Sequence, residues 1–300
     1  MKILITGSNG LLGQKLVKLL IESNEEVIAT ARNGNRLPTE YTGYTFEEMD
    51  ITDPVSVEKI LQKHCPDAVI NTAAMTNVDE CEKDKAGCDL LNVEAVKHLI
   101  EGCNQINAHL IHLSTDFIFD GTHGPLTEED KPNPISYYGE SKLKSEELVM
   151  AKSYKWSIVR TVLVYGIAHD MSRSNIILWV KNSLENRKNI QVVNDQWRTP
   201  TLAEDLAQGC YLIAKNSTEG IFNISGADML TPYEMAIQTA EFFELDKSLI
   251  EETDGSKFTQ PAKRPPKTGF IIEKAKKQLG YQPHTFKEGL KVLGDQLQKS

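Results

Sequence analysis

The sequence predicts an α/β fold built on a doubly wound parallel sheet. Three observations support this class. Short β-branched runs alternate with helical stretches through the first half, a glycine-rich turn directly follows the first run, and the regular alternation ends after Gly166. Such alternation is typical of parallel strands joined by crossover helices on both faces of a sheet. A chain of 300 residues can hold one such domain and a smaller partner.

The expected strands are apolar runs, and the expected helices are the longer stretches between them. In the first half we expect strands over 2–6, 27–31, 68–71, 109–113 and 157–161, with helices over 11–23, 56–64, 86–103 and 136–151. Further on we expect a helix over 176–185, strands over 190–193 and 220–224, and a helix that begins at Thr231 with Pro232 in its first turn. The irregular segment 120–134 is long enough to suggest a functional loop.

Composition and charge exclude several classes of protein. The content of 40% hydrophobic and 25% charged residues is that of a globular protein, and the net charge of −9 argues against a nucleic-acid partner. No apolar stretch reaches transmembrane length, so we expect no membrane association. The five cysteines form no CxxC pair and the histidines show no metal-ligand spacing, which predicts reduced thiols, no metal and a cytoplasmic location.

The glycine-rich turn ITGSNGLLG separates the first expected strand from the first expected helix. Its glycines follow a GxxGxxG spacing instead of the more common GxGxxG. Glycine permits a tight bend, the approach of a pyrophosphate to the backbone and close helix packing, while amides at the helix start bind phosphate. Plain turns also use glycine, but the position between strand and helix favours a dinucleotide site. The residues expected to form it are Gly7, Asn9, Gly10, Leu11, Leu12 and Gly13.

The end of the second expected strand bears on the choice of cofactor. About 20 residues after such a turn, NAD-binding folds usually carry an acidic residue that binds the ribose hydroxyl. Here the strand ends in Ala29-Thr30-Ala31-Arg32, without a carboxylate. A guanidinium binds phosphate in a fork, so Arg32 indicates NADP(H) as the preferred cofactor and NAD(H) as the alternative. A solvated loop arginine would account for the same residue equally well.

Tyr138 and Lys142, in SYYGESK, lie four residues apart on an expected helix and therefore share a face. A free tyrosine has a pKa of about 10, and a nearby ammonium lowers that pKa toward the range useful for proton transfer. The pair predicts Tyr138 as a proton donor tuned by Lys142, although surface helices carry such pairs by chance. Ser114-Thr115-Asp116 supplies the context, because it follows an expected strand at the sheet edge where ligands bind. The Thr115 hydroxyl can polarise a carbonyl there.

Four motifs together resemble those of the extended short-chain dehydrogenases/reductases, which have a Rossmann-type fold. They are TGSNGLLG at 6–13, NTAA at 71–74, STDFIFDG at 114–121 and YYGESK at 137–142, and the resemblance spans nearly the whole chain. Within that family, the pattern is most similar to the dTDP-4-dehydrorhamnose reductases. The motifs that carry this likeness are STDFIFDGT, PISYYGESKLKSE, VRTVLVYG, DQWRTPT and Arg264-Pro265.

The resemblance implies transfer of a hydride from NADPH to the C4 ketone of a nucleotide-linked 6-deoxysugar, as in the conversion of dTDP-4-dehydro-L-rhamnose to dTDP-L-rhamnose. It implies that Tyr138 protonates the alkoxide, that Thr115 holds the ketone oxygen and that Lys142 also binds the nicotinamide ribose. Other implied contacts are with the cofactor, from Asp50, Ile51, Ala73, Ala74 and Asn92, and with the substrate, from Asp116, Arg198 and Arg264. A surface ion pair with Glu204 or Asp205 is the alternative for Arg198. Leu163 stands where these reductases commonly carry a tryptophan of the sugar pocket.

The same resemblance suggests how the chain is divided. We expect residues 1–165 to form an NAD(P)-binding domain to which the chain returns around 190–225. We expect residues 166–189 and 226–300 to form a smaller, C-terminal substrate-binding domain. The expected partner is a nucleotide-sugar, with a homodimer as the candidate assembly.

Two other functions fit the same motifs. A nucleotide-sugar epimerase or dehydratase shares the Tyr/Lys pair but retains its nicotinamide through the cycle, so tightly bound NAD would indicate it. A dehydratase usually adds a glutamate after the aspartate of the STD motif, whereas here Phe117 follows Asp116. A non-catalytic NADP-binding regulatory subunit, like the relative that partners methionine adenosyltransferase, is the third reading, and an assay for turnover separates it from the reductase.

Overall fold

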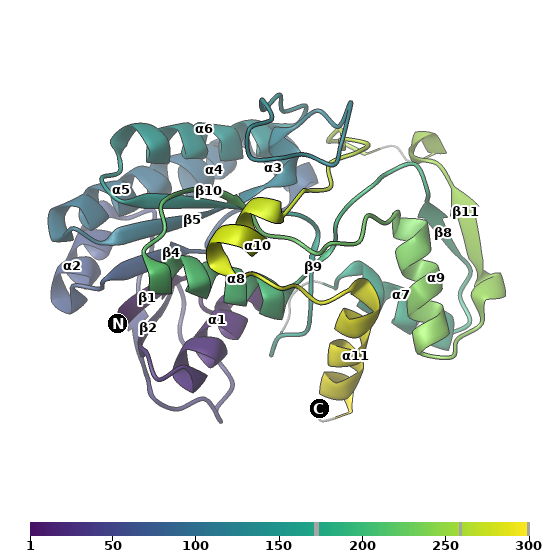
Figure 1. Ribbon diagram of the computed structural model, residues 1–300, viewed down its shortest axis with the longest axis horizontal. Coiled ribbons are helices and arrows are strands. Elements are labelled where there is room, and N and C mark those ends of the chain that lie inside the picture. The colour runs from purple at the N-terminus through teal and green to yellow at the C-terminus, as the bar shows by residue number, and fades with distance from the viewer. Residues whose placement is uncertain (171–173, 258–259, 299–300) are drawn as a thin grey trace.

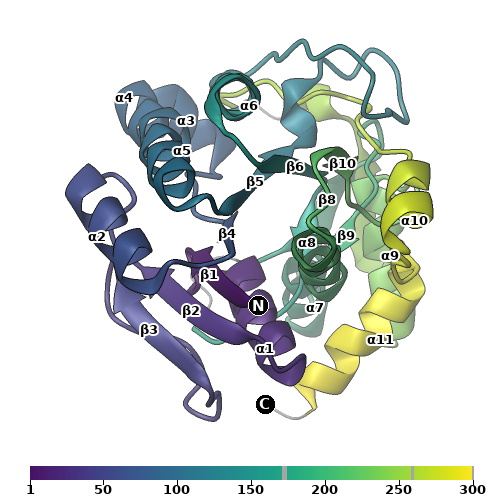
Figure 2. The same cartoon turned by 60° about the vertical axis from the view of Figure 1, so that its left-hand side comes forward.

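A seven-stranded sheet forms the centre of the computed structural model, which describes residues 1–170, 174–257 and 260–298. Its strand order is β10-β6-β5-β4-β1-β2-β3, and every neighbouring pair runs parallel. Helices cover both faces (Figures 1 and 2). The predicted doubly wound, Rossmann-type sheet is therefore confirmed, and its strand order reverses between β1 and β4.

The strands of the central sheet are β1 (Lys2–Thr6), β2 (Glu26–Ala31), β3 (Tyr44–Glu48), β4 (Ala68–Asn71), β5 (His109–Thr115), β6 (Trp156–Thr161) and β10 (Gly220–Asn223). One face is covered by α1 (Leu11–Glu22) and α8 (Ala203–Asn216), and the other by α2 (Pro54–His64), α5 (Ala95–Ile106) and α6 (Tyr137–Lys152), as Figure 2 shows. Apolar side chains of the inner strands enter one hydrophobic cluster on each face. The inner strands are thus buried on both sides, as parallel sheets require.

The single helix expected over 86–103 is interrupted in the structure. α3 (Val78–Lys83) and α4 (Lys85–Asp89) are followed by a π-helical turn, Leu90–Glu94, before α5 begins. The side chain of Asn92 in this turn binds both backbone groups of Met75, at 2.8 Å and 3.0 Å. A π turn of this kind often marks a local functional constraint. Here it fastens the helix to the segment that follows β4.

A smaller body lies at the right of Figure 1. Its elements are α7 (Ile176–Glu185), β8 (Ile190–Val193), α9 (Pro232–Phe242), β11 (Ile250–Thr253) and α11 (Phe286–Leu297). β8 pairs in parallel with β11, outside the central sheet. α9 begins as predicted, with Thr231 in a capping box and Pro232 in the first turn.

The chain passes between the central sheet and the smaller body repeatedly. After β7 (Val164–Tyr165) and α7 it returns through β9 (Thr201–Leu202), α8 and β10, and after β11 it returns once more to α10 (Glu273–Leu279). α10 packs on α8 and β10, whereas α11 packs on α9. In the described residues, no helix has both the length and the apolar character that a bilayer crossing demands.

Candidate functional site

The glycine turn after β1 lies at the point where the strand order reverses. Gly7 has a φ of +66°, and a Cβ there would lie 3.0 Å from Thr72 Oγ1 and 3.1 Å from the Ala73 backbone. A Cβ on Gly13 would lie 2.6 Å from Ser8 Cα, so α1 can pack on the turn only without that side chain. No side chain caps the start of α1. The first amides of the helix are therefore open to a ligand.

Two cavities meet at this turn. The glycine-turn cavity has a volume of about 350 Å³ and the central cavity about 490 Å³. Gly7, Gly10, Thr72 and Ala74 line both, so the two form one continuous groove. Of the predicted residues, the glycine-turn cavity is also lined by Asn9, Arg32, Asp50, Ile51 and Ala73. The central cavity is also lined by Leu11, Leu12, Gly13, Thr115, Asp116, Tyr138 and Lys142.

Two arginines line the glycine-turn cavity, and sequence reasoning identified only Arg32. Arg36 also lines it, and its guanidinium lies 3.6 Å from an Asp170 carboxylate oxygen. The Asn9 amide holds the intervening loop, because it donates to the Asn33 carbonyl at 3.2 Å and its oxygen accepts from the Arg36 backbone N–H at 3.0 Å. The presence of a second arginine four residues after Arg32 could have identified Arg36 from the sequence.

Tyr138 and Thr115 meet at the wall of the central cavity. Ser136 caps α6 by accepting the Gly139 N–H at 3.2 Å, which places Tyr138 in the first turn of the helix, opposite the end of β5. Tyr138 is only 8% exposed, and burial raises its pKa well above the ordinary value, while the neighbouring Thr115 side chain partly opposes the rise. Burial is the largest influence on this pKa. The tuning of Tyr138 by Lys142 stays a prediction.

Lys142 is almost fully buried beside Tyr138, and both line the central cavity. Its Nζ lies 3.2 Å from His112 Nε2. Burial lowers the pKa of Lys142 to about 8, against the opposing charges of Glu146 and Cys88. The lysine can therefore change its charge close to physiological pH. Sequence reasoning overlooked His112, because a histidine within a strand carries no motif.

Asp116 follows Thr115 and is 2% exposed. One carboxylate oxygen accepts the Thr115 hydroxyl at 3.1 Å, and the other accepts the Thr268 hydroxyl and lies 3.6 Å from Arg198 Nε. Burial raises the pKa of Asp116, which the Arg198 charge and these hydrogen bonds oppose. Asp116 thus connects the central cavity to the segment that precedes α10.

Arg198 is buried and contributes to neither cavity of the groove within the described chain. Its guanidinium donates to the carbonyls of Pro265, at 2.6 Å, and Pro266, at 3.3 Å. The ion pair of Arg198 with Glu204 or Asp205, which the sequence left open, does not form. Glu204 pairs with Lys15 and Asp205 pairs with His284. Arg198 therefore fixes the backbone immediately after Arg264.

Asn92 also stands behind the groove, because its side chain is turned toward protein groups. Besides Met75, its amide binds Ser141 Oγ on α6 at 3.0 Å. Ser141 in turn donates to the Tyr138 carbonyl at 2.8 Å. The predicted asparagine thus links the segment after β4 to the helix turn that carries Tyr138.

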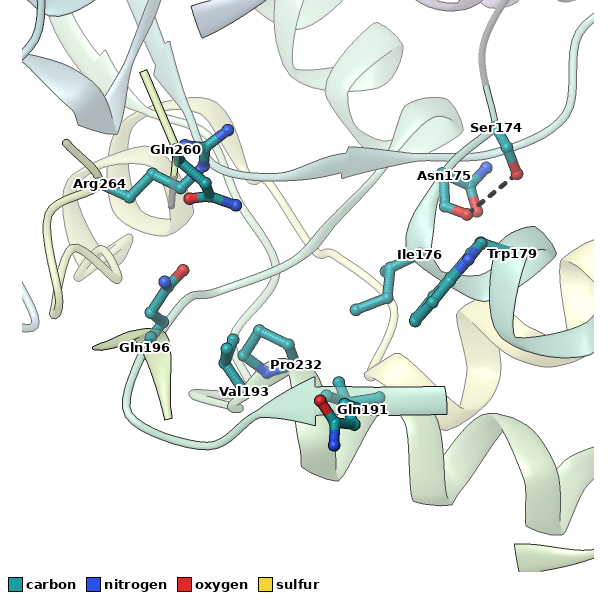
Figure 3. A pocket seen from close by; sticks show the side chains of 12 residues that line it. Ser174, Asn175, Ile176, Trp179, Gln191, Val193, Gln196, Pro232, Gln260 and Arg264 are labelled. Atoms are coloured by element: carbon teal, nitrogen blue, oxygen red, sulfur yellow. Dashed lines mark hydrogen bonds between the residues drawn. The ribbon is translucent and has the colours of Figure 1, made fainter. Parts of the chain in front are cut away.

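A third cavity, the distal cavity, has a volume of about 440 Å³ and lies in the smaller body. In Figure 3, Trp179 and Ile176 lie at one end, and Gln196, Gln260 and Arg264 at the other. Trp179 is 40% exposed. An indole face, amide groups and one guanidinium can bind a planar heterocycle and an attached anion. Of these residues the sequence indicated only Arg264.

Arg264 joins the distal cavity to the groove. Its guanidinium forms two hydrogen bonds with the Asp79 carboxylate, at 2.9 Å and 3.2 Å. The neighbour of Asp79, Val78, lines the central cavity. A ligand that reached from the central cavity to Trp179 would therefore pass Arg264.

Comparison with known proteins agrees with this geometry. The model of the RmlD substrate-binding domain family matches residues 1–299. The chain belongs to this family. Its relatives include a Streptomyces antibioticus protein named probable dTDP-4,6-dihydroxy-2-methyloxan-3-one 4-ketoreductase, which is 33% identical over 268 residues, 88% of this chain and 85% of the relative. The RmlD family assignment confirms the resemblance drawn from the motifs.

Two further similar proteins carry names that state different functions. Methionine adenosyltransferase 2 subunit beta from Bos taurus is 30% identical over 252 residues, which cover 82% of this RmlD-family chain and 73% of the relative. The structure of dTDP-4-dehydrorhamnose reductase from Bacillus anthracis in complex with NADP is 25% identical, with a TM-score of 0.84, and the match covers 98% of this chain and 99% of that one.

The groove of this RmlD-family chain fits a dinucleotide. Its glycine turn leaves no room for side chains but leaves the helix amides open, and two arginines line its far end. In the part of the chain that the structure describes, the buried Ser114 hydroxyl at the wall of the central cavity has no hydrogen-bond partner. A buried polar group left in this way calls for a bound partner.

Proposed function

We propose that this chain is an NADPH-dependent reductase of the 4-keto group of a nucleotide-linked 6-deoxysugar, as in the conversion of dTDP-4-dehydro-L-rhamnose to dTDP-L-rhamnose. One observation carries the proposal. Thr115 and Tyr138 line the same wall of a cavity that continues into the glycine turn, and Thr115 is close enough to the phenol to lower its pKa against the effect of burial. The names of the 4-ketoreductase and the dTDP-4-dehydrorhamnose reductase among the similar proteins support the reaction class.

The groove residues divide into those that would hold the phosphates and the nicotinamide ribose of the cofactor and those that would contact its adenine side. Backbone amides from Leu11 to Gly13 would hold the diphosphate, Lys142 the nicotinamide ribose, and Arg32 and Arg36 the additional phosphate that distinguishes NADP(H) from NAD(H). The contacts on the adenine side would come from Asp50, Ile51, Ala73 and Ala74, with Asn9 in the same cavity holding the loop that carries Arg36. Asn92 would support the turn of α6 that carries Tyr138. The chemistry supplied by the bound cofactor is a hydride for the carbonyl carbon.

Thr115 and Tyr138 would both donate hydrogen bonds to the ketone oxygen. As that oxygen becomes an alkoxide it takes the phenolic proton of Tyr138, and the raised pKa of the phenol ensures that this proton is present at neutral pH. The Lys142 ammonium and the Thr115 hydroxyl then stabilise the phenolate in a buried, weakly polar site. Proton donation of this kind typically contributes about 10² to 10⁴ in rate.

The substrate would span the central and distal cavities. We propose that its sugar lies beside Asp116 and Leu163, its diphosphate near Arg264, and its base against Trp179 in the distal cavity. Arg198 supports the diphosphate site by holding the backbone that follows Arg264. On this basis residues 1–165, with a return within 190–225, form the cofactor domain, and 166–189 with 226–300 form the substrate domain.

The deciding experiment supplies purified protein with NADPH and dTDP-4-dehydro-L-rhamnose and follows the loss of NADPH absorbance. We expect wild type to consume NADPH, and Tyr138→Phe to lose at least about 100-fold in kcat. Tyr137→Phe is the matched control, because its hydroxyl is bonded to Asp89 at 2.7 Å and contributes nothing to the central cavity lining. Equal rates for wild type and Tyr138→Phe would show that the catalytic assignment is wrong.

A non-catalytic NADP-binding subunit is the second candidate, because methionine adenosyltransferase 2 subunit beta is among the relatives. NADP(H) that raises the melting temperature without turnover of any keto-sugar would establish it. NAD that stays bound through purification would indicate the epimerase or dehydratase instead. We further propose a cytoplasmic homodimer that does not bind nucleic acid. The net charge of −9 supports the last point, and light scattering tests the assembly.

A further inference from the structure

A chain of buried polar side chains runs across three adjacent strands to Lys142. The Thr6 hydroxyl on β1 donates to Asn71 Oδ1 on β4 at 2.6 Å, and the Asn71 amide nitrogen lies 3.1 Å from His112 Nδ1 on β5. His112 Nε2 lies 3.0 Å from Ser145 Oγ and 3.2 Å from Lys142 Nζ, both on α6. None of the five side chains is more than 3% exposed. Water therefore does not compete for these bonds.

The direction of the hydrogen bonds fixes where His112 carries its proton. Because Asn71 Oδ1 accepts from Thr6, its amide N–H faces His112 Nδ1, which must accept. Ser145 donates its hydroxyl proton to the Lys142 carbonyl at 2.7 Å, so its oxygen accepts from His112 Nε2. Both ends demand a neutral imidazole with its proton on Nε2. Burial and the adjacent Lys142 keep the pKa of His112 well below its ordinary value, which agrees with a neutral ring.

In this tautomer the Nε2–H that Ser145 accepts also lies beside Lys142 Nζ, which is 3.2 Å from the same nitrogen. An ammonium has donors only and cannot accept this N–H, whereas a neutral amine can. We propose that His112 is a positioning residue that holds its Nε2 proton against Lys142 Nζ and thereby favours the neutral amine. The inference rests on the proposed reductase function for its catalytic meaning. There, the Lys142 ammonium passes one proton to the Tyr138 phenolate, the phenol is restored, and His112 stabilises the amine that remains.

The other titratable groups around Lys142 raise its pKa, whereas burial lowers it. Glu146 on α6 and Cys88 on α4 both favour the charged lysine, whereas burial disfavours it, and Tyr138 lines the same cavity. Glu146 is itself paired with Arg160 on β6 at 2.7 Å. His112 therefore adds to the effect of burial and opposes the two acidic neighbours.

The direct test is a pH titration of the Lys142 Cε resonance in the free, full-length protein, with isotope-labelled lysine and the assignment made from Lys142→Arg. We expect a wild-type midpoint of about 8. In His112→Gln, an amide oxygen can accept from the ammonium, so the midpoint should rise by about one pH unit, a tenfold gain in proton affinity. In Ser145→Ala, the amine is the remaining acceptor for Nε2–H, so the midpoint should fall by about half a unit.

The matched control is His109→Gln. His109 is also buried on β5, but its Nε2 binds Ser157 at 2.8 Å, so the Lys142 midpoint should not move. The proposal also requires that the pH profile of kcat for His112→Gln shift by the same amount as the resonance. If the midpoint of the Lys142 resonance did not move in His112→Gln and kcat fell equally at every pH, His112 would have a merely structural role. That outcome would overturn the proposal. If His112→Gln fails to fold, the Lys142 midpoint in Ser145→Ala decides the proposal, because a fall supports it and a rise or no change overturns it. The resonance reports on Lys142 without turnover, so this result is independent of the reductase assay.

Discussion

Arg160 and Glu146 form a buried, two-pronged ion pair between β6 and α6. Arg160 Nη2 lies 2.7 Å from one carboxylate oxygen and Nε lies 3.0 Å from the other, and the side chains are 3% and 0% exposed. This pair fixes the position of α6, the helix that presents Tyr138 and Lys142 to the central cavity. The geometry of this wall of the central cavity thus depends on an ion pair outside the cavity lining.

Replacement of Arg160 by methionine should destabilise the protein strongly. The change leaves the Glu146 carboxylate buried without its partner, which typically costs about 3 to 5 kcal/mol in the free energy of unfolding. Urea denaturation measures this loss. Lys181→Met is the control, since it breaks a more exposed pair with Glu185 on α7 and should cost no more than about 0.5 kcal/mol. Equal losses in the two variants would contradict the importance of the buried pair.

The glycine-turn cavity should select NADPH through its two arginines. Arg32→Ala and Arg36→Ala each remove a donor for the additional phosphate, and one charged hydrogen bond contributes about 1.5 to 3 kcal/mol. The ratio of kcat/KM for NADPH to that for NADH should therefore fall about 10- to 100-fold in each variant. Arg187→Ala, an exposed arginine of the smaller body, should leave the ratio unchanged. A ratio unaltered in all three would exclude these arginines from cofactor selection.

The fit of α1 against the β1 turn makes Gly13 intolerant of any side chain. A Cβ at this position would lie 2.6 Å from Ser8 Cα, and forced overpacking costs about 1 to 3 kcal/mol. Gly13→Ala should therefore lower the melting temperature and weaken NADPH binding. Gly34→Ala is the control, because nothing lies within 4 Å of a Cβ there. Thermal unfolding with and without NADPH compares the two, and a stable, tightly binding Gly13→Ala would refute the packing argument.

Lys142 should give wild type a distinctive dependence of stability on pH. Burial lowers its pKa from 10.5 to about 8, so between these values the unfolded chain binds more protons than the folded one. Wild-type stability relative to Lys142→Met should consequently rise with pH across this window, by about 3 kcal/mol in total, and be lowest below it. Urea unfolding of both proteins at several pH values tests this. Parallel stability curves would mean that the lysine is not perturbed.

Arg264 should govern substrate affinity more than turnover. It lines the distal cavity and is oriented by Asp79, whose neighbour Val78 lines the central cavity. Arg264→Ala should raise KM for the nucleotide-sugar about 10-fold or more, with a smaller change in kcat, because a phosphate contact acts on ground and transition states alike. Arg264→Lys should recover part of this, since it keeps the charge but loses the fork. An increase confined to KM for NADPH would place the arginine in the wrong site.

The inner strands and the glycine turn were predictable because their signals are local. β4 is a short apolar run with every residue buried, and its bounds match the expectation. β3 was not predicted from the sequence, because it is an edge strand whose sequence, YTFEE, has no buried residue. α8 was not predicted because Leu202 occupies its capping position and makes no side-chain cap, which leaves only two acidic residues in the first turn as a start signal. Local patterns therefore describe the centre of the sheet better than its periphery.

The meeting of Thr115 and Tyr138 at the wall of the central cavity was predictable for a different reason. Thr115 and Tyr138 are placed by the ends of β5 and α6, and such ends of a parallel sheet meet at one edge. The distal cavity could not be foreseen, because α7, β8 and the segment around Arg264 bring its lining together from distant parts of the sequence. Tertiary packing alone brings Trp179 and Gln260 into one cavity. The same holds for the alignment of Asn71, His112 and Lys142 across neighbouring elements.

The repeated crossings between the central sheet and the smaller body limit how the protein can move. A wide hinge opening requires that two lobes be joined by few linkers, each free to rotate. Within the described residues, the lobes are tethered through the segments around residues 163–170, 193–203, 223–232, 260–273 and 279–286. Such multiple tethering restricts motion to small sliding displacements of packed elements. Entry of the sugar nucleotide and departure of the product must accordingly proceed by local rearrangement at the rim of the groove.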